Sequence, residues 1–136
     1  MNNYFLTLFS ILFFYQFSYG QISKKFEPID VFDIEYVSSP EISPEGNKIL
    51  FQRNFKDIMT DRNLSNLWIV NFDGTDMRPI TTGNHNATSP KWSNSGKMFT
   101  YKSNTEGRTQ LYLHNLENNS VQKLTNMQSS IGSVEW

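Results

Sequence analysis

The sequence has 136 residues, a formal net charge of −1 and an isoelectric point near 6.1, so it lacks the basic excess of proteins that bind nucleic acid or anionic membranes. It contains no cysteine, which excludes disulfides, thiolate metal ligands and a cysteine nucleophile. Aromatic residues make up 15% of the chain, enough to fill the cores of β-sheets.

Residues 1–20 are predicted to be a secretory signal peptide rather than part of the fold. Tyr4–Phe17 is an almost unbroken apolar run without charge, and Ser18 and Gly20 place small residues just before a cleavage site at Gln21. No Lys or Arg precedes the run, which leaves an uncleaved anchor as the alternative, although the run is shorter than the roughly 20 residues of a membrane span. We expect cleavage and a secreted or periplasmic chain that leaves the membrane.

Residues 21–38 form a lead-in segment. Pro28–Tyr36 is typical of a short helical turn whose apolar side chains pack against the domain that follows. Asp30 can accept hydrogen bonds from the first free backbone N–H groups of this turn. An irregular segment is the alternative.

Two stretches fifty residues apart carry the same hairpin pattern. Ser89–Tyr101 begins with Ser-Pro, ends a first strand near Trp92, turns at Asn-Ser-Gly and returns as a second strand. Ser39–Phe51 has Ser, Pro, Ser, Gly, Lys and a final aromatic residue at matching positions, and a third copy starts at Ser133–Trp136. Glycine in each turn supplies a backbone angle that other residues adopt at a cost. A strand-rich period of about 40–50 residues is typical of a β-propeller.

Each repeat continues with two further predicted strands. In the first repeat these are Leu67–Asn71 and, after an Asp-Gly turn, Met77–Thr81. Pro79 suits an outer edge because proline cannot donate to a ladder. In the second repeat Leu111–Asn115 and Val121–Thr125 take the same places.

The interval between the second and third strands is about six residues longer in the first repeat, so we expect the polar stretch Arg53–Asn66 to be an inserted loop. The sequence thus predicts an all-β fold, a partial β-propeller with two four-stranded antiparallel blades at 39–82 and 83–128. Residues 129–136 are expected to start a third blade at which this sequence is truncated.

The repeat pattern, S-P-x-[aromatic or aliphatic]-S-x-x-G with a later L-[WY] and [IL]-T, resembles the blades of two groups of proteins. One group is the TolB-type periplasmic propellers. The other is the N-terminal propellers of prolyl oligopeptidase family serine peptidases, in the acylaminoacyl-peptidase and dipeptidyl-peptidase branch. The lead-in Ile29–Asp33 running into Val37–Pro40, and the insertion Asp57–Trp68, resemble the peptidases more closely. The resemblance covers Pro28–Trp136.

The peptidase resemblance implies a propeller that covers an α/β-hydrolase domain and restricts access to short peptides, with the catalytic residues in that C-terminal domain. No G-x-S-x-G nucleophile elbow occurs in this sequence. We therefore expect an N-terminal propeller piece of an exported serine peptidase, whose hydrolase domain is missing here. We expect no catalytic residue, metal site or cofactor in this piece, and we assign no substrate-binding residue. The TolB resemblance implies instead a non-enzymatic propeller that binds a protein partner in the cell envelope.

His85 and His114 are the only histidines. We expect His114 to be a partly exposed strand residue, and His85 lies in a link between blades, where no Ser–His–acid spacing is readable. Asp57 and Asp61 lie in the inserted loop, where calcium binding is conceivable. Two acidic residues are too few for such a site, so we interpret them as solvated loop residues.

The best functional candidates are the three cations Arg53, Lys56 and Arg62 of the insertion, which could contact a substrate or the missing domain. Among the tryptophans, which could stack on a ligand, Trp92 and Trp136 occupy matching positions of two repeats. Recurrence in register indicates packing, so we predict that both are core residues.

Overall fold

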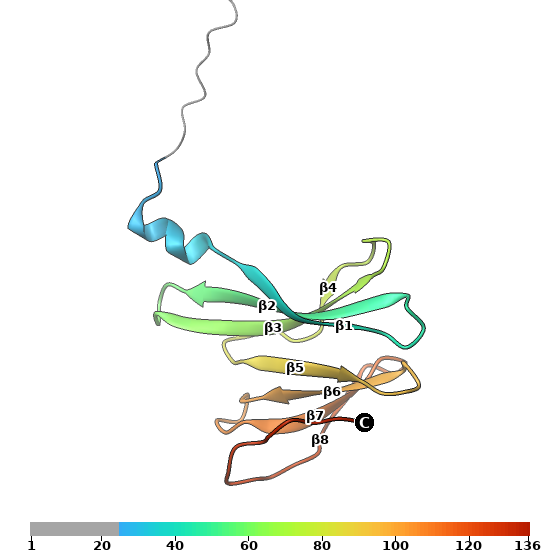
Figure 1. The fold of residues 1–136 in the computed structure, drawn as a ribbon. Helices are drawn as coiled ribbons and strands as arrows, with labels where there is room; N and C mark the ends of the chain where they lie inside the picture. The colour runs from blue at the N-terminus through green and yellow to red at the C-terminus, as the bar shows by residue number, and fades with distance from the viewer. Residues whose placement is uncertain (1–24) are drawn as a thin grey trace, which may run out of the picture.

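The structure, a computed structural model, describes residues 25–136, so the predicted signal peptide and its cleavage site lie outside the described residues. The chain forms two four-stranded antiparallel sheets stacked one on the other, with a short helix ahead of the first (Figure 1). Each sheet is a simple meander, in the orders β1-β2-β3-β4 and β5-β6-β7-β8. The all-β prediction of two four-stranded blades is confirmed.

The regular elements follow one another along the chain with short connections. They are the 3-10 helix η1 (Pro28–Asp33), β1 (Tyr36–Ile42), β2 (Lys48–Asp57), β3 (Arg62–Asn71), β4 (Arg78–Pro79), β5 (Ala87–Trp92), β6 (Met98–Ser103), β7 (Gln110–Asn115) and β8 (Ser120–Lys123). No helix among residues 25–136 is long and apolar enough to cross a membrane.

The lead-in forms the helical turn that the sequence predicts, with a different cap. Glu27 precedes η1, and Asp30 lies in the first turn of the helix. The backbone N–H of Glu27 donates to the carboxylate of Asp30 at 2.8 Å. The prediction that Asp30 caps the first free N–H groups of this turn is wrong, because Glu27 holds the cap position and Asp30 lies three residues further on. The contact between Glu27 and Asp30 closes the first turn and directs the chain into β1.

Both predicted hairpin turns are present and built alike. Gly46 and Gly96 adopt φ angles of 71° and 68°, which favour glycine. The hydroxyl of Ser43 accepts the N–H of Lys48 at 3.0 Å, and Ser93 accepts the corresponding N–H in the second blade. The serine that follows each first strand therefore fixes the start of the second strand.

The [IL]-T motif at the end of each repeat has a structural reason. The hydroxyl of Thr81 accepts the N–H of Leu67 at 2.9 Å, and the hydroxyl of Thr125 accepts the N–H of Leu111 at the same distance. Each threonine replaces a ladder bond where the outer strand has already ended, so β4 and β8 are shorter than predicted. Pro79 lies on the edge strand β4, as predicted.

The hydrophobic core lies between the two blades. One cluster of buried side chains joins β2 and β3 to β5, β6 and β7: Leu50, Leu67, Ile69, Ala87, Trp92, Phe99, Tyr101 and Tyr112. Trp92 is only 8% exposed and packs edge-on against Phe99, with 5.8 Å between ring centroids. The prediction that Trp92 is a core residue is confirmed.

An indole hydrogen bond joins the inner strands of the blades. Trp92 Nε1 donates to the backbone carbonyl of Glu41 at 3.0 Å, and the ammonium of Lys91 forms an ion pair with the Glu41 carboxylate. The same relation recurs further along, where Trp136 Nε1 donates to the carbonyl of Lys91 at 2.9 Å. Glu41 and Lys91 hold matching positions, so each tryptophan contacts the preceding inner strand at the same place.

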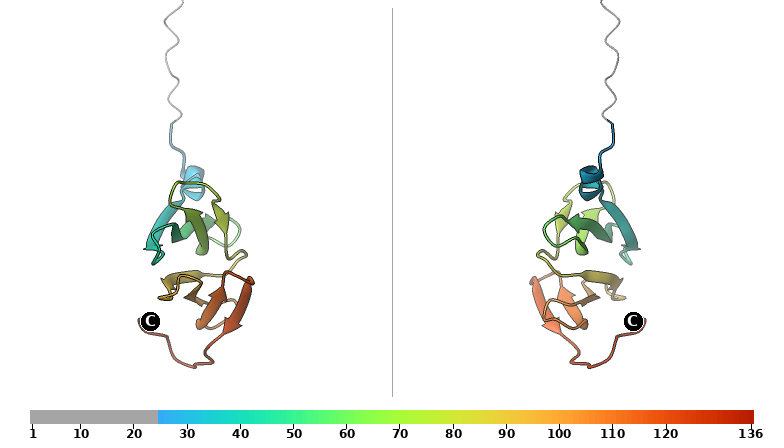
Figure 2. Two further views of the ribbon diagram at one scale, coloured as in Figure 1. Left: turned by 90° about the vertical axis from the view of Figure 1, so that its right-hand side faces the viewer. Right: turned by 90° about the vertical axis from the view of Figure 1, so that its left-hand side faces the viewer.

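Trp136 itself is half-exposed, so its predicted core position is wrong for this chain. After β8 the chain passes below the second blade (Figure 2), and the described residues 124–136 contain no strand. Among the described residues no strand pairs with Ser133–Trp136, so the indole contact forms while half of the Trp136 side chain stays exposed.

The predicted inserted loop Arg53–Asn66 is also corrected, because most of it is strand. β2 and β3 pair residue by residue as far as Asp57 and Arg62, and only residues 58–61 form the turn. The segment carries few apolar residues because solvent surrounds its far end, so the alternation that indicates a strand is missing there.

Ile42 marks a face of the first blade that no other sheet covers within residues 25–136. It takes the place that Trp92 has in the second blade and is 59% exposed. Phe51 and Trp68 are paired across β2 and β3, so they lie on one face of the sheet, the same face as Ile42. Leu50 and Ile69, the neighbouring pair, point to the opposite face, toward the second blade.

Trp92→Ala should lower the free energy of unfolding of the complete propeller by about 3–5 kcal/mol, the usual range for a buried large aromatic. Trp92→Phe, which keeps a ring but removes the N–H to Glu41, should cost less. Trp68→Ala is the matched control and should cost less than Trp92→Ala, because Trp68 is only partly buried. Denaturant melts measure all three, and a near-neutral Trp92→Ala would contradict the interface described above.

Residues 21–136 expressed alone should be oligomeric, loosely folded or insoluble, because the uncovered face at Ile42 exposes apolar surface and repeat arrays generally need about three or more units. Size-exclusion chromatography and near-UV circular dichroism measure this. A sharp monomer with fixed aromatic signals and a cooperative melt would be evidence against it.

Candidate functional site

Each blade begins and ends at the same side of the molecule. A blade has an even number of antiparallel strands, so its outer strand returns the chain to the side at which its inner strand began. We call this side, on the left of Figure 1, the linker rim, and the opposite side the turn rim. The linker rim comprises residues 35–36, 57–62, 86–87 and 103–110, and the turn rim 43–47, 71–77, 93–97 and 116–119.

The hairpin of β2 and β3 projects from the linker rim. Both strands have ten residues, whereas β6 and β7 have six each. The two hairpins start at matching residues of the repeat, so the extra four residues per strand extend the linker rim by about 13 Å. This projection carries the candidate cations and acids of the sequence.

Arg53 is held against the uncovered face of the first blade. Its Nε donates to a carboxylate oxygen of Glu35 at 2.8 Å, and its terminal nitrogen pairs with the other oxygen. The guanidinium carbon lies 5.2 Å from the ring centroid of Trp68 and 5.6 Å from that of Phe55. A bidentate ion pair and two cation–π contacts fix this side chain, so Trp68 supports an arginine rather than an open stacking surface.

Lys56 and Arg62 are exposed on the projecting hairpin and do not converge with Arg53 on one point. Strand alternation places Lys56 on the side that faces the second blade, whereas Arg62 pairs with Asp57 on the other side. Arg62 Nε donates to the hydroxyl of Thr60 at 3.4 Å. The structure therefore brings two of the three predicted cations to the hairpin and anchors the third nearer the blade.

The carboxylate of Asp57 closes the hairpin turn. It accepts the hydroxyl of Thr60 at 2.6 Å and the backbone N–H of Met59 at 3.0 Å, and these hydrogen bonds lower the pKa of the carboxyl. Asp61 has a φ of 48°, a turn conformation that aspartate tolerates. Within residues 25–136, no group of three or more His, Asp or Glu side chains could hold a metal ion.

The link between the blades is fastened to both of them by Asn86. Its backbone N–H donates to the Asn104 side-chain oxygen at 2.7 Å, and its side-chain oxygen accepts the Ser65 hydroxyl at 3.4 Å. His85 lies beside Asn86, half-buried, with its ring close to Gly83.

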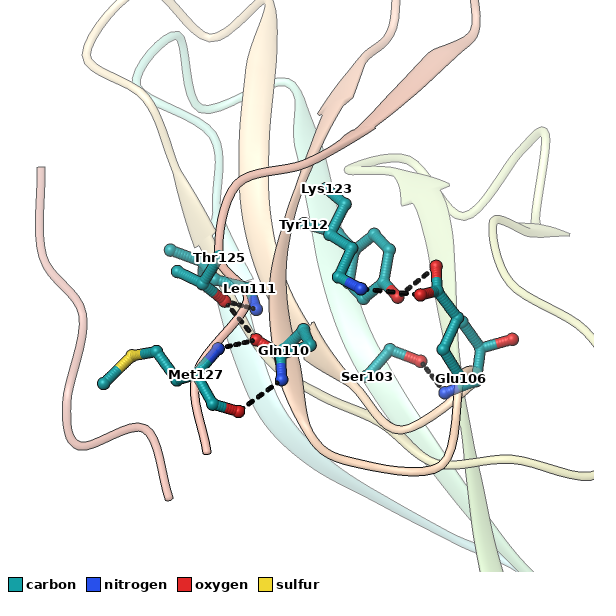
Figure 3. A network of polar contacts seen from close by, with 9 residues as sticks. Ser103, Glu106, Gln110, Leu111, Tyr112, Lys123, Thr125 and Met127 are labelled. Atoms are coloured by element: carbon teal, nitrogen blue, oxygen red, sulfur yellow. Dashed lines mark hydrogen bonds and ion pairs between the residues drawn. The ribbon is translucent and has the colours of Figure 1, made fainter. Parts of the chain in front are cut away.

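Gln110 is a linker-rim residue that sequence reasoning missed, because a glutamine at the start of a strand gives no local signal. Figure 3 shows that its amide holds the segment after β8. The side-chain oxygen accepts the N–H of Met127 at 2.9 Å and the hydroxyl of Thr125 at 2.7 Å, and Nε2 donates to the Met127 carbonyl at 2.9 Å. The chain that leaves the outer strand is therefore fixed along the linker rim.

A second polar group in Figure 3 lies beside Gln110. Lys123 donates to the carboxylate of Glu106 at 2.6 Å, and the hydroxyl of Tyr112 donates to the other oxygen at 3.2 Å. The Lys123 contact is the main reason why the pKa of Glu106 is lowered. Because the pair is exposed, it contributes little stability and mainly orients the turn.

His114 is buried, not partly exposed as the sequence predicted. It is 3% exposed and stacks on Phe99 with 5.0 Å between ring centroids. Nε2 lies 3.1 Å from the side-chain oxygen of Asn119, while Nδ1 has no partner. Burial lowers the pKa of the imidazole, and the charge of Arg78 acts in the same direction. The stacking on Phe99 and the contact with Asn119 give His114 a packing role in the blade interface.

Residues 24–136 match the TolB beta propeller domain family, PD40. This match covers most of the chain and agrees with the two blades described above. The chain belongs to the TolB beta propeller domain family.

Three curated relatives of this PD40 propeller fall into two classes. The chain is 28% identical over 108 residues, 79% of its length, to "Uncharacterized peptidase YuxL" of Bacillus subtilis, and 33% identical over 75 residues, 55% of its length, to dipeptidyl-peptidase 5 of Porphyromonas gingivalis. It is 29% identical over 106 residues, 76% of its length, to the protein TolB homolog of Chlamydia abortus. The chain spans 16%, 11% and 24% of these relatives, respectively.

Solved structures agree on the fold. An acylaminoacyl peptidase of Pyrococcus horikoshii superposes with a TM-score of 0.69, at 18% identity, over 82% of this chain and 17% of that one. The propeller domain of the Trilobed protease from Pyrococcus furiosus gives a TM-score of 0.61, at 23% identity, over 75% of this chain and 30% of that one. At such identities the likeness concerns the fold alone.

Acidification should weaken the blade interface through His114. Above the ordinary imidazole pKa of 6.5 the ring is neutral in both folded and unfolded chains. As the pH falls below 6.5, the unfolded chain takes up a proton that the buried ring resists, so stability is lost until the lower folded pKa is passed. Denaturant melts of the complete propeller between pH 7 and pH 5 should show a shallower decline for His114→Gln than for the wild type.

His85→Gln is the matched control, because that side chain lies in the link rather than among the interface rings. The free energy of unfolding of this variant should fall with decreasing pH as steeply as that of the wild type. If the free energy of unfolding of His114→Gln falls with pH as steeply as that of the wild type, groups other than His114 cause the acid sensitivity.

Proposed function

We propose that these blades belong to the N-terminal propeller of an exported serine peptidase that acts on short peptides, in which the propeller restricts access to an α/β-hydrolase domain. The observation that carries the proposal is the similarity to proteins named as peptidases, over 79% of the chain for YuxL and at 33% identity for dipeptidyl-peptidase 5. The blades correspond to 16% and 11% of these relatives, which leaves room for a separate catalytic domain.

The chemistry of the described residues is in keeping with a gating role rather than a catalytic one. The one histidine in the blade interface is buried and bonded to an amide. The cations of the long hairpin are placed to contact a neighbour rather than to activate a nucleophile. In this proposal the nucleophile, acid and base, and with them the peptide substrate, lie in the hydrolase domain.

The second candidate is a non-enzymatic, TolB-like propeller that binds a protein partner in the cell envelope. It is supported by 29% identity to the TolB homolog of Chlamydia abortus over 76% of the chain. The two candidates predict different polypeptides around the same blades.

The experiment begins with the DNA that follows the codon of Trp136. A reading frame that continues into G-x-S-x-G, then Asp and His, supports the peptidase, and a stop codon after a closed propeller supports the TolB-like candidate. The complete protein should then hydrolyse dipeptidyl or aminoacyl chromogenic substrates and lose this activity to a serine-directed inhibitor. Residues 21–136 alone should give only background hydrolysis, because a missing catalytic constellation costs many orders of magnitude in rate. Inhibitor-sensitive turnover by residues 21–136 would overturn the assignment.

A further inference from the structure

The long hairpin of the first blade extends beyond the length that a four-stranded blade of this fold requires. We call Asn54–Ser65 the arm, since these residues extend beyond the length of the corresponding hairpin in the second blade. The second blade forms a complete four-stranded sheet without such an extension. We therefore ask what the projecting tip of the arm contacts outside its own blade.

The arm is stiff. Its strands pair without a break from Asn54 and Ser65 to Asp57 and Arg62, and Asp57 closes the turn at the tip. At its base the Asn54 amide donates to the hydroxyl of Ser38 at 2.8 Å. A paired and anchored hairpin holds its tip in one position relative to the blade, as a docking element requires.

The tip of the arm carries two apolar side chains between charged ones. Ile58 is 54% exposed and Met59 is 87% exposed, while Lys56 and Arg62 flank them on opposite sides of the hairpin. Single exposed apolar residues are common on protein surfaces. Two adjacent ones at the end of a rigid projection are placed to enter a depression on a neighbouring surface.

The position of the arm indicates which neighbour this is. The arm rises from the linker rim, and both ends of every blade lie at that rim. A domain joined to either end of an array of these blades is thus tethered on the side that the arm faces. A separate protein would need about 800 Å² of contact per partner, far more than two side chains supply. A tethered domain has a high effective concentration, so a small contact suffices to orient it.

We propose that the arm is a docking element for the catalytic domain of the same polypeptide. Ile58 and Met59 enter an apolar depression on that domain, and Lys56 and Arg62 face acidic groups around it. This inference rests on the proposed function, because it requires a hydrolase domain joined to the propeller. It adds a surface, a set of residues and an orientation to that function.

Oxidation of methionine in the complete protein tests the proposal, with Met77 as internal control. In the described structure the Met59 side chain is 87% exposed and that of Met77 is 62% exposed. Met77 lies on the turn rim, away from the arm. Dilute hydrogen peroxide converts accessible methionine to the sulfoxide, which mass spectrometry quantifies for each site. If the catalytic domain covers the arm, Met59 should oxidise at least about ten-fold more slowly than Met77. Met59 oxidising as fast as Met77, or faster, would overturn the proposal.

Lys56→Glu with Arg62→Glu tests the charged flanks and should raise the rate at Met59 toward that at Met77. The control Lys97→Glu, a cation on the turn rim, should leave both rates unchanged. Continued protection of Met59 in the double variant would overturn the role of the cations. If the double variant fails to fold, the wild-type comparison of Met59 with Met77 still decides the docking itself.

The same preparation separates this inference from the proposed function. Inhibitor-sensitive hydrolysis together with fast oxidation of Met59 would overturn only the docking of the arm. A complete protein without hydrolase activity would overturn both. Protection of Met59 that is lost on dilution would identify a second copy as the covering partner and would also overturn the proposal.

Discussion

The hydrogen bond from the Trp92 indole to the carbonyl of Glu41 gives the stacking of the blades its direction, and the ion pair of Lys91 with Glu41 lies beside it. Apolar packing between the sheets is strong but has little directional preference, so it would tolerate small shifts of one blade on the other. A nearly buried indole N–H needs an acceptor, and the inner strand of the first blade offers it at one residue. The recurrence of this contact from Trp136 to Lys91 indicates that it is a property of the repeat.

The first blade departs from this rule and is specialised in two ways. It has Ile42 in place of the tryptophan, so its inner strand carries no indole at the position of Trp92. On the same face Arg53 is fastened between Glu35 and the ring of Trp68, which links the lead-in to the sheet. Its second hairpin also extends into the arm. These features distinguish the first unit of the array from the second, although both have the same strand order.

Local chemistry made much of this fold predictable. The turn glycines, the edge proline and Trp92 each have a short-range reason that can be read in the sequence, and all occupy the predicted places. The arm was misread as a loop because the residues nearest its tip are exposed and mostly polar, so hydrophobic alternation is missing there. His114 was misread because a polar residue was taken as exposed, although it lies two residues after the buried Tyr112 and therefore on the same face of β7. The hydrogen bond from Gln110 to Met127 joins residues seventeen positions apart, so no local sequence pattern predicts it.

The return of every blade to the rim at which it began has an evolutionary consequence. Duplication or loss of one whole repeat changes the circumference of the array but leaves the polarity of its two ends as it was. A domain fused at either end therefore meets the same side of the array whatever the number of repeats. Such architecture lets a lineage vary the width of the passage through a propeller by recombination of whole units, without redesigning the junction to its neighbour.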